Sequence, residues 1–280
     1  MTRLELFGQP RLINNPKKMN YIKYLLFLFL SNLGAQNIEI DFISIENTSN
    51  VISSTKTNYK LILKDSASCY FNTLKDESQF IYGNNAFDKK QVKDVTQIKL
   101  SDNHFGIIKD DFFYKNFIKD TLIYNEIISN EKIYVGEKNN IFSWEIKPSS
   151  DTLVLGFRCQ KAITKFRGRT YEATFSSELA PYGGPWKFDG LPGLIISVKS
   201  LDNYFIIFPV KIVVNKKEPL ICENIYKEKK IISWNEFKKM FKENMERKLK
   251  MLRSKSENGE GGSIKIGDKI EDLEIPEMKF

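Results

Sequence analysis

The sequence predicts a mainly β fold of the α+β class, with a curved antiparallel sheet or half-barrel and one late amphipathic helix. Runs in which apolar residues alternate with other residues follow one another between Asn116 and Val214, and this is the period of a strand with one buried face. Turn residues, rather than helical patterns, separate these runs. Strands joined in series favour an antiparallel meander over a parallel sheet.

The first half of the chain predicts short strands and long loops. Tyr59, Leu61 and Leu63 share one face of a strand, and Cys69-Tyr70-Phe71 begins a second short element. Residues 74–111 are the most polar part of the chain and contain paired asparagine and aspartate residues that are typical of loops. We therefore expect long loops in this region.

Alternation and turn signals predict the strands of the second half. One long strand would carry Leu153, Leu155, Phe157 and Cys159 on a single face. Residues 166–169 and the Asp202-Asn203 pair predict turns between strands. The other expected strands include Ile133 and Val135, residues 142–146, Tyr171 with Ala173 and Phe175, residues 194–199 and residues 204–214.

One helix is expected late in the chain. Ser233 and Glu236 have the spacing of a capping box. An apolar stripe at helical spacing follows it, made of Phe237, Phe241, Met245, Leu249 and Leu252. The other face is rich in lysine and arginine, so the helix could contact an anionic membrane surface. Packing of the stripe on the sheet is the favoured alternative, because tertiary packing supplies most helix stability.

The N-terminal region has the order of a secretory signal. Basic residues from Lys17 to Lys23 precede an uncharged apolar run that ends in small residues at Ala35. The run is shorter than the roughly 20 residues of a membrane span, so we expect cleavage after Ala35, with Met19 as an alternative start. Removing residues 1–35 lowers the formal net charge from +8 to +4, which weakens the case for nucleic-acid binding.

These features divide the chain into a signal peptide with an upstream extension (1–35), a β-rich domain (36–255) and a flexible C-terminal tail (256–280). The tail follows a stretch rich in glycine, serine and glutamate, which is typical of a linker. Export would place the protein in the periplasm, at the outer membrane or outside the cell.

Histidine and cysteine counts exclude several kinds of site. The chain has one histidine, His104, in a polar turn-like segment, whereas His-rich zinc sites need more imidazoles. The three cysteines are far apart and form no Cys-x-x-Cys pair. The sequence therefore predicts no catalytic residue, no metal site and no cofactor.

One motif carries a family resemblance. Residues 184–195 read Gly-Pro-Trp-Lys-Phe-Asp-Gly-Leu-Pro-Gly-Leu-Ile, and this segment resembles the signature of the GLPGLI family, exported Bacteroidetes proteins of unestablished function. The resemblance extends through residues 159–162 and 166–169 and, more faintly, to most of the mature chain. Thr174 replaces a tryptophan common in that family, and Leu179-Ala180-Pro181 replaces a typical Ile-Pro step. The resemblance implies export and a β-rich fold, and it implies no reaction.

The motif has a structural and a functional interpretation. Structurally, Pro192 and Gly193 suit a type II turn, in which glycine accepts a positive φ. Functionally, the segment would be a recognition loop that exposes aromatic rings beside a rigid turn. The residues of this candidate loop are Tyr182, Trp186, Phe188, Gly190, Leu191, Pro192 and Gly193.

Cys159 has three interpretations. It lies on the apolar face of its predicted strand, so a buried small residue or half of a disulfide with Cys69 or Cys222 is favoured. A nucleophilic role would need an activating base, and the chain has one histidine.

Three functions are consistent with these observations. The first is a non-enzymatic envelope protein that binds a lipid, a peptide or a partner protein. The second is a secreted hydrolase with paired carboxylates, because the spatial pairing of remote acids is invisible in a sequence. The third is a structural or secretion-associated surface component.

Overall fold

The computed structural model describes most of the chain after residue 36. The described residues are 37–47, 53–64, 66–73, 79–82, 111–180, 182–215, 217, 220–255, 263–264, 269–276 and 278–279. The expected signal peptide, His104 and most of the expected loop region between residues 74 and 110 lie outside them.

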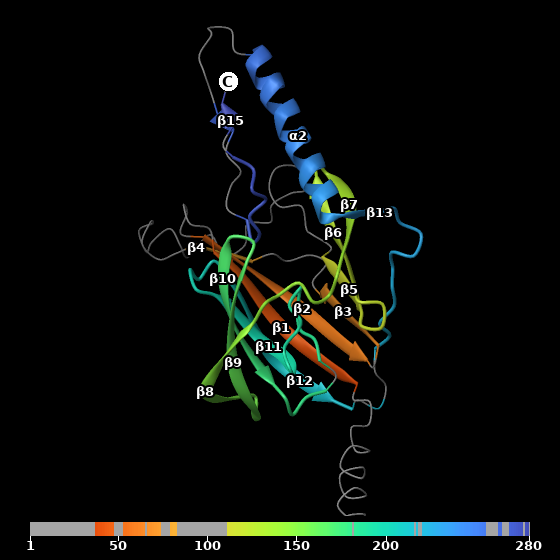
Figure 1. Ribbon diagram of the computed structural model, residues 1–280, viewed down its shortest axis with the longest axis vertical. Helices are drawn as coiled ribbons and strands as arrows, with labels where there is room; N and C mark the ends of the chain where they lie inside the picture. Colours follow the sequence, from red (N-terminus) through yellow and green to blue (C-terminus); the bar gives the residue numbers. More distant parts are fainter. Residues whose placement is uncertain are drawn as a thin grey trace, which may run out of the picture. The chain divides into compact units, whose positions relative to one another are not determined.

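A large, mostly antiparallel sheet dominates the described residues (Figure 1), and a single helix follows it in the chain. Its order is β13-β7-β6-β5-β3-β2-β1-β12-β11-β10-β9-β8, with β4 also paired to β2. The β13–β7 pair is parallel, and the neighbouring pairs are antiparallel. The elements are β1 (Ile38–Asn47), β2 (Ser53–Lys64), β3 (Ala67–Asn72), β4 (Gln79–Tyr82), β5 (Phe112–Asn116), β6 (Thr121–Ile128), β7 (Glu131–Glu137), β8 (Glu145–Val154), β9 (Phe157–Phe166), β10 (Arg169–Ser176), β11 (Leu194–Ser200), β12 (Phe205–Val214), β13 (Ile231–Ser233), α2 (Trp234–Lys255), β14 (Ser263–Ile264) and β15 (Met278–Lys279).

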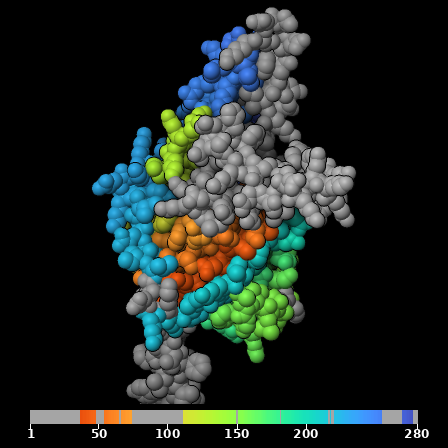
Figure 2. All heavy atoms as spheres, turned by 180° about the vertical axis from the view of Figure 1, so that it is seen from behind, coloured from red at the N-terminus to blue at the C-terminus, as the bar shows by residue number. Residues whose placement is uncertain are grey.

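Alternation predicts the buried faces of the central strands. Leu61 and Leu63 are fully buried and Tyr59 nearly so, and Tyr171 and Ala173 are also inaccessible. The expected turn at residues 166–169 is confirmed, because Arg167 and Gly168 both have positive φ between β9 and β10. Seen from behind in Figure 2, the bands of β2, β1 and β12 lie side by side, as their pairing requires.

Two strand predictions are wrong. Leu155 and Gly156 have φ angles of 49° and 89° and form the turn of the β8–β9 hairpin, so Leu153 and Cys159 belong to different strands. Leu153 and Leu155 are consequently exposed. The alternating run of residues 142–146 becomes a strand only from Glu145 onwards. Alternation persists across a tight hairpin turn, and this hides the turn from a periodicity argument.

The sheet is curved, as expected, and the contacts of one short segment demonstrate it. Lys187 Nζ lies 3.8 Å from the centroid of the Tyr124 ring of β6, and the Phe188 ring is 5.2 Å from that of Tyr171 of β10. β6 and β10 are seven strand positions apart, which corresponds to about 34 Å across a flat sheet. Adjacent residues can reach both strands only because the sheet curls around them.

Helix α2 begins with the expected capping box. Ser233 Oγ accepts a hydrogen bond from the Glu236 amide, and the Glu236 carboxylate accepts one from the Ser233 amide at 2.7 Å. Phe237 and Met245 of the stripe are buried, whereas Leu252 is exposed. Among the described residues, we find no helix with the length and apolar character needed to cross a membrane.

Part of the C-terminal region packs into the core, which differs from the expected flexible tail. Leu273 belongs to the hydrophobic core and Glu271 is buried. The Tyr171 hydroxyl donates a hydrogen bond to the Ile270 carbonyl at 3.0 Å, and Arg169 donates to the Lys269 carbonyl. We call residues 269–276 the C-terminal segment. The linker-like composition of residues 256–263 predicts a loosely held tail, but the side chains of the C-terminal segment are partly buried in the core.

The disulfide joins Cys69 to Cys222, and Cys159 is free and buried. Of the interpretations of Cys159, the small buried residue is confirmed, and the bridge to Cys69 or Cys222 is wrong because those two cysteines are bonded to each other. Burial raises the pKa of the Cys159 thiol to about 11, which disfavours a nucleophilic role. The Cys69–Cys222 bridge is typical of an oxidising environment outside the cytoplasm.

The turn at Pro192-Gly193 differs from the expected type II turn. Gly193 is absent from the glycines with positive φ, whereas Gly190 has a φ of 88°. Gly193 is required for space instead, because a Cβ there would lie 2.4 Å from the carbonyl oxygen of Ser176 in β10. A glycine lets the chain pass this strand end closely before β11 begins.

This distinction gives a prediction about two glycines. Gly193→Ala should lower the free energy of unfolding by about 1 to 3 kcal/mol through overpacking, and Gly193→Asn should lower it further. Gly156 has a φ of 89° and nothing within 4 Å of its Cβ position. There asparagine should be tolerated better than alanine, because asparagine accepts positive φ more readily.

Urea denaturation of the four variants measures which of alanine and asparagine is more stable at each position. An asparagine at position 193 that is more stable than alanine would restore the positive-φ explanation. If alanine and asparagine rank in the same order at positions 193 and 156, the two glycines are not required for different reasons.

Candidate functional site

Residues 184–193 of the glycine-rich motif, which we call the plug, are mostly buried inside the curved sheet and do not form an exposed loop. Trp186 is 6% exposed, Phe188 is fully buried, and Leu191 and Gly193 are buried as well. Tyr182, Gly190 and Pro192 are the exposed members of the expected recognition loop. The expectation of free aromatic faces at Trp186 and Phe188 is therefore wrong, because both rings fill the space enclosed by the curl.

The side chain of Lys115 in β5 binds the backbone of the plug. Its buried ammonium group donates hydrogen bonds to the carbonyl oxygens of Gly184, at 3.2 Å, and Phe188. It also lies 3.4 Å from a carboxylate oxygen of Asp189. Burial lowers the pKa of Lys115, although Asp189 opposes the shift. The segment between residues 184 and 189 is thus folded around a cation supplied by β5.

Lys187 occupies a cage of aromatic rings and carboxylates. Its Nζ atom lies 3.8 Å from the Tyr124 ring centroid, 5.0 Å from that of Trp234 and 5.2 Å from that of Trp186. It forms an ion pair with Glu271 and lies 3.9 Å from oxygens of both Glu126 and Glu137. The side chain is fully buried, so this charge is balanced entirely within the protein.

Arg167 connects the same carboxylates. It pairs with Glu137 and Glu271, and its guanidinium lies 3.7 Å from the Trp234 ring centroid. Burial alone would raise the pKa of Glu137, but the hydrogen bond from Arg167 and the charge of Lys187 outweigh burial and lower it. The network therefore joins the plug, β7, the start of α2 and the C-terminal segment.

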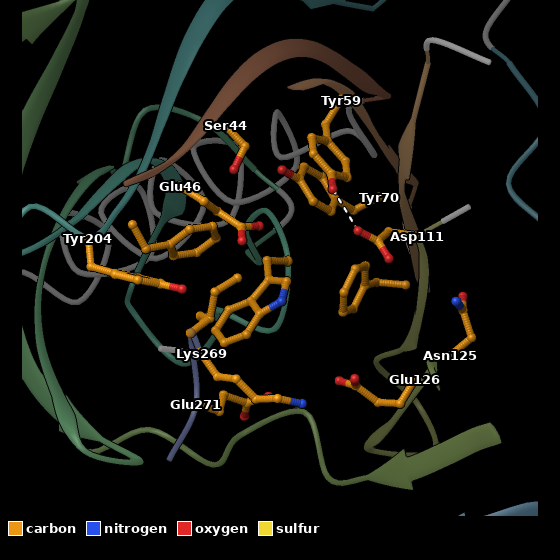
Figure 3. Close-up of a pocket in the computed structure, with 14 residues that line it drawn as sticks. Ser44, Glu46, Tyr59, Tyr70, Asp111, Asn125, Glu126, Tyr204, Lys269 and Glu271 are labelled. Carbon is orange, nitrogen blue, oxygen red and sulfur yellow. Dashed lines mark hydrogen bonds between the residues drawn. The ribbon is translucent and has the colours of Figure 1, made fainter. Parts of the chain in front are cut away.

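A pocket of about 140 Å³ lies beside the plug (Figure 3). Residues of β1, β2, β3, β5, β6 and β12 line it, together with the plug and the C-terminal segment. The lining residues are Ser44, Glu46, Tyr59, Tyr70, Asp111, Phe113, Asn125, Glu126, Trp186, Tyr204, Phe205, Lys269, Ile270 and Glu271. The pocket is therefore walled by aromatic rings and carboxylates.

One buried polar group in this wall, the Tyr70 hydroxyl, has no hydrogen-bond partner among the described residues. Tyr59 and Tyr70 stack with ring centroids 4.7 Å apart, and the Tyr59 hydroxyl donates to Asp111 at 2.7 Å. The Asn125 amide lies on the other face of β6, where its Oδ1 accepts a hydrogen bond from the Tyr226 hydroxyl. Burial raises the pKa of Tyr70 well above its usual value, so its hydroxyl remains protonated. Unsatisfied buried groups are uncommon in native proteins and are expected where a ligand completes a site.

Trp186 adds a strained backbone to the same wall. Its φ of 52° is unusual for a bulky residue. The ring is held between Phe188 at 4.9 Å and Phe205 at 5.5 Å. Such strain persists only where packing fixes it, and it clusters at functional sites.

The site combines donors, acceptors and carboxylates without a metal-binding cluster among the described residues. Carboxylates in one pocket can bind cations or hydroxyl groups, and they can also perform acid–base chemistry. Sequence reasoning identified Trp186 but missed Tyr70, Asn125 and the four acids. Their positions run from residue 46 to residue 271, and no local spacing relates them.

Comparisons with known proteins give only a distant structural likeness. No family model matches the sequence, and no curated protein matches it. One crystal form of PNGF-II has 15% identity and a TM-score of 0.46 over 75% of this chain and 34% of the solved chain. A second form has 14% identity and a TM-score of 0.45 over 84% and 36% of the two chains. The chain thus spans about a third of the solved chains that it matches.

Proposed function

We propose that this protein is an exported envelope protein of the GLPGLI type that binds a peptide through the pocket beside the plug. The Cys69–Cys222 disulfide supports export, and the apolar run before Ala35 supports a cleaved signal. The periplasm, the outer membrane and the outside of the cell are the locations that this export allows.

The single observation that carries the binding role is the unsatisfied, buried Tyr70 hydroxyl in the pocket wall. Leaving a buried polar group without a partner costs about 1 to 3 kcal/mol, so a ligand that supplies partners recovers this cost. The pocket of about 140 Å³ is small beside the roughly 300 Å³ or more typical of drug-sized ligands. Its size and polarity suit one polar side chain of a peptide better than a lipid chain.

Hydrolysis with paired carboxylates is the second candidate function. Glu46, Asp111 and Glu126 come from different segments and line one pocket, and acid–base hydrolysis uses carboxyl groups gathered in this way. The basic face of α2 would still allow contact with an anionic membrane surface in either case, and a partner protein could present the bound peptide.

The test compares two tyrosine variants. Tyr70→Phe removes an unsatisfied hydroxyl, so the free protein should be unchanged or up to about 1 kcal/mol more stable and should bind peptide more weakly. Tyr59→Phe is the matched control from the same stacked pair. It removes a hydrogen bond to a carboxylate and should lose about 1.5 to 3 kcal/mol. Urea denaturation measures the stabilities.

Binding is measured by equilibrium dialysis against an equimolar mixture of acetylated tripeptide amides that carry each side chain between two glycines. Mass spectrometry identifies the retained members. We expect native protein to retain at least one member more strongly than Tyr70→Phe does. Retention of no peptide, or phospholipid in an organic extract of the purified protein, would contradict peptide binding. If the native protein cleaves a peptide and Asp111→Asn does not, hydrolysis would replace binding as the proposed function.

A further inference from the structure

The pocket has a charge opposite to that of the chain. Two of the carboxylates in the pocket lining, Glu126 and Glu271, already face Lys187. The whole sequence has a formal net charge of +8, yet the lining contains four carboxylates and one ammonium group. The ammonium group of that lysine, Lys269, lies 4.2 Å from the centroid of the Phe241 ring of α2. A cleft lined by one sign of charge concentrates ligands of the other sign.

The aromatic walls suit the same kind of ligand. Tyr59, Tyr70, Phe113 and Trp186 present rings to the pocket. The faces of such rings attract ammonium and guanidinium groups, most strongly where water is excluded. A wall of rings that also contains carboxylates can therefore hold a cation by two independent forces.

The protein uses this combination for its own Lys187. The Lys187 cage and the pocket share Trp186, Glu126 and Glu271 as walls. The lysine is fully buried there, which demonstrates that rings and carboxylates of this arrangement accommodate a dehydrated ammonium group. The pocket, which contains the same shared residues, also combines aromatic rings with carboxylates.

The unsatisfied Tyr70 hydroxyl adds a polar contact for such a cation. The Tyr70 oxygen can accept a hydrogen bond from an ammonium or guanidinium group. Figure 3 shows the Tyr70 and Glu46 side chains on the same side of the pocket. The side chain of a lysine or arginine residue in a peptide offers this cation.

We propose that the pocket binds the cationic side chain of a lysine or arginine residue in an extended peptide. This inference rests on the proposed peptide-binding function and names its specificity. Glu46, Asp111 and Glu126 supply the negative wall, and the Tyr70 hydroxyl accepts the hydrogen bond that orients the ligand.

The experiment is titration calorimetry with four acetylated tripeptide amides, each with glycine on both sides of the central residue. The central residues are arginine, lysine and their neutral analogues citrulline and N-acetyl-lysine. We expect the cationic peptides to bind at least about tenfold more tightly than the neutral ones, and to lose affinity as salt rises. Glu46→Gln should weaken the cationic peptides about tenfold, because it removes one carboxylate of the wall.

Glu145→Gln is the matched control, because it also removes one negative charge but lies on an exposed part of β8. It should leave the affinity unchanged, and thermal melting should confirm that both variants fold. Equal binding of citrulline and arginine peptides would overturn the cation specificity while leaving peptide binding intact. Failure of all four peptides, together with retention of no member in the dialysis experiment, would overturn the proposed function as well.

Discussion

Replacing Lys187 with methionine should lower the free energy of unfolding by about 3 to 5 kcal/mol, because removing one member of a buried charge network leaves its partners uncompensated. Glu271 would lose its ion pair, and Glu126 and Glu137 would lose a cation 3.9 Å away. Arg167 alone would then face Glu137 and Glu271. Methionine fills a volume similar to that of lysine, so the lost stability reflects the missing charge more than lost packing. Urea denaturation measures the change.

Two further variants separate the network from lysine removal in general. Lys238 pairs with Glu274 at 2.6 Å, but the Glu274 side chain is 73% exposed, so Lys238→Met should cost less than about 1 kcal/mol. Adding Glu271→Gln to Lys187→Met should recover part of the loss, because it removes one uncompensated charge. The network would be refuted if Lys187→Met and Lys238→Met lowered the free energy of unfolding equally. It would also be refuted if the effects of Lys187→Met and Glu271→Gln simply added in the double variant.

Local patterns in the sequence predict the parts of the fold that depend on neighbours in the chain. The capping box of Ser233 and Glu236, the turn at Arg167-Gly168 and the buried face of Tyr171 and Ala173 are all decided within a few residues. The hairpin turn at Leu155-Gly156 is missed, because both residues continue the alternation of apolar and other side chains.

Long-range contacts decide the rest. Gly193 is a glycine because Ser176 of a neighbouring strand leaves no room for a Cβ, and a sequence does not show which strand passes there. The pairing of Cys69 with Cys222 spans 153 residues, and three cysteines allow three pairings. For Cys159, the apolar face of its strand is consistent with a buried small residue as well as with a disulfide, and the sequence does not choose between them.

The pocket was hidden for the same reason. Its four acids are drawn from 35 aspartate and glutamate residues, and nothing in their local sequence distinguishes them. The Lys187 cage has one local signal, a lysine between a tryptophan and a phenylalanine in a strongly apolar motif. A charge at such a position indicates a buried partner, but the partner, Glu271, lies 84 residues later.

Trp186→Ala should lower the free energy of unfolding by about 3 to 5 kcal/mol, the usual cost of truncating a buried aromatic residue. The ring packs against Phe113, Phe188 and Phe205 with centroid distances between 4.9 and 6.4 Å. It also forms one wall of the Lys187 cage. Truncation therefore opens a cavity and uncovers a buried cation at the same time. Thermal melting and urea denaturation measure the loss.

Tyr182→Ala is the control from the same segment. Tyr182 is 61% exposed, so its truncation should change stability by less than about 0.5 kcal/mol. If Trp186→Ala instead melts like the native protein and only loses peptide, Trp186 is a recognition residue and the plug is not part of the core. The two aromatic rings of one segment thus have opposite expected roles, because the curved sheet encloses Trp186 and leaves Tyr182 in water.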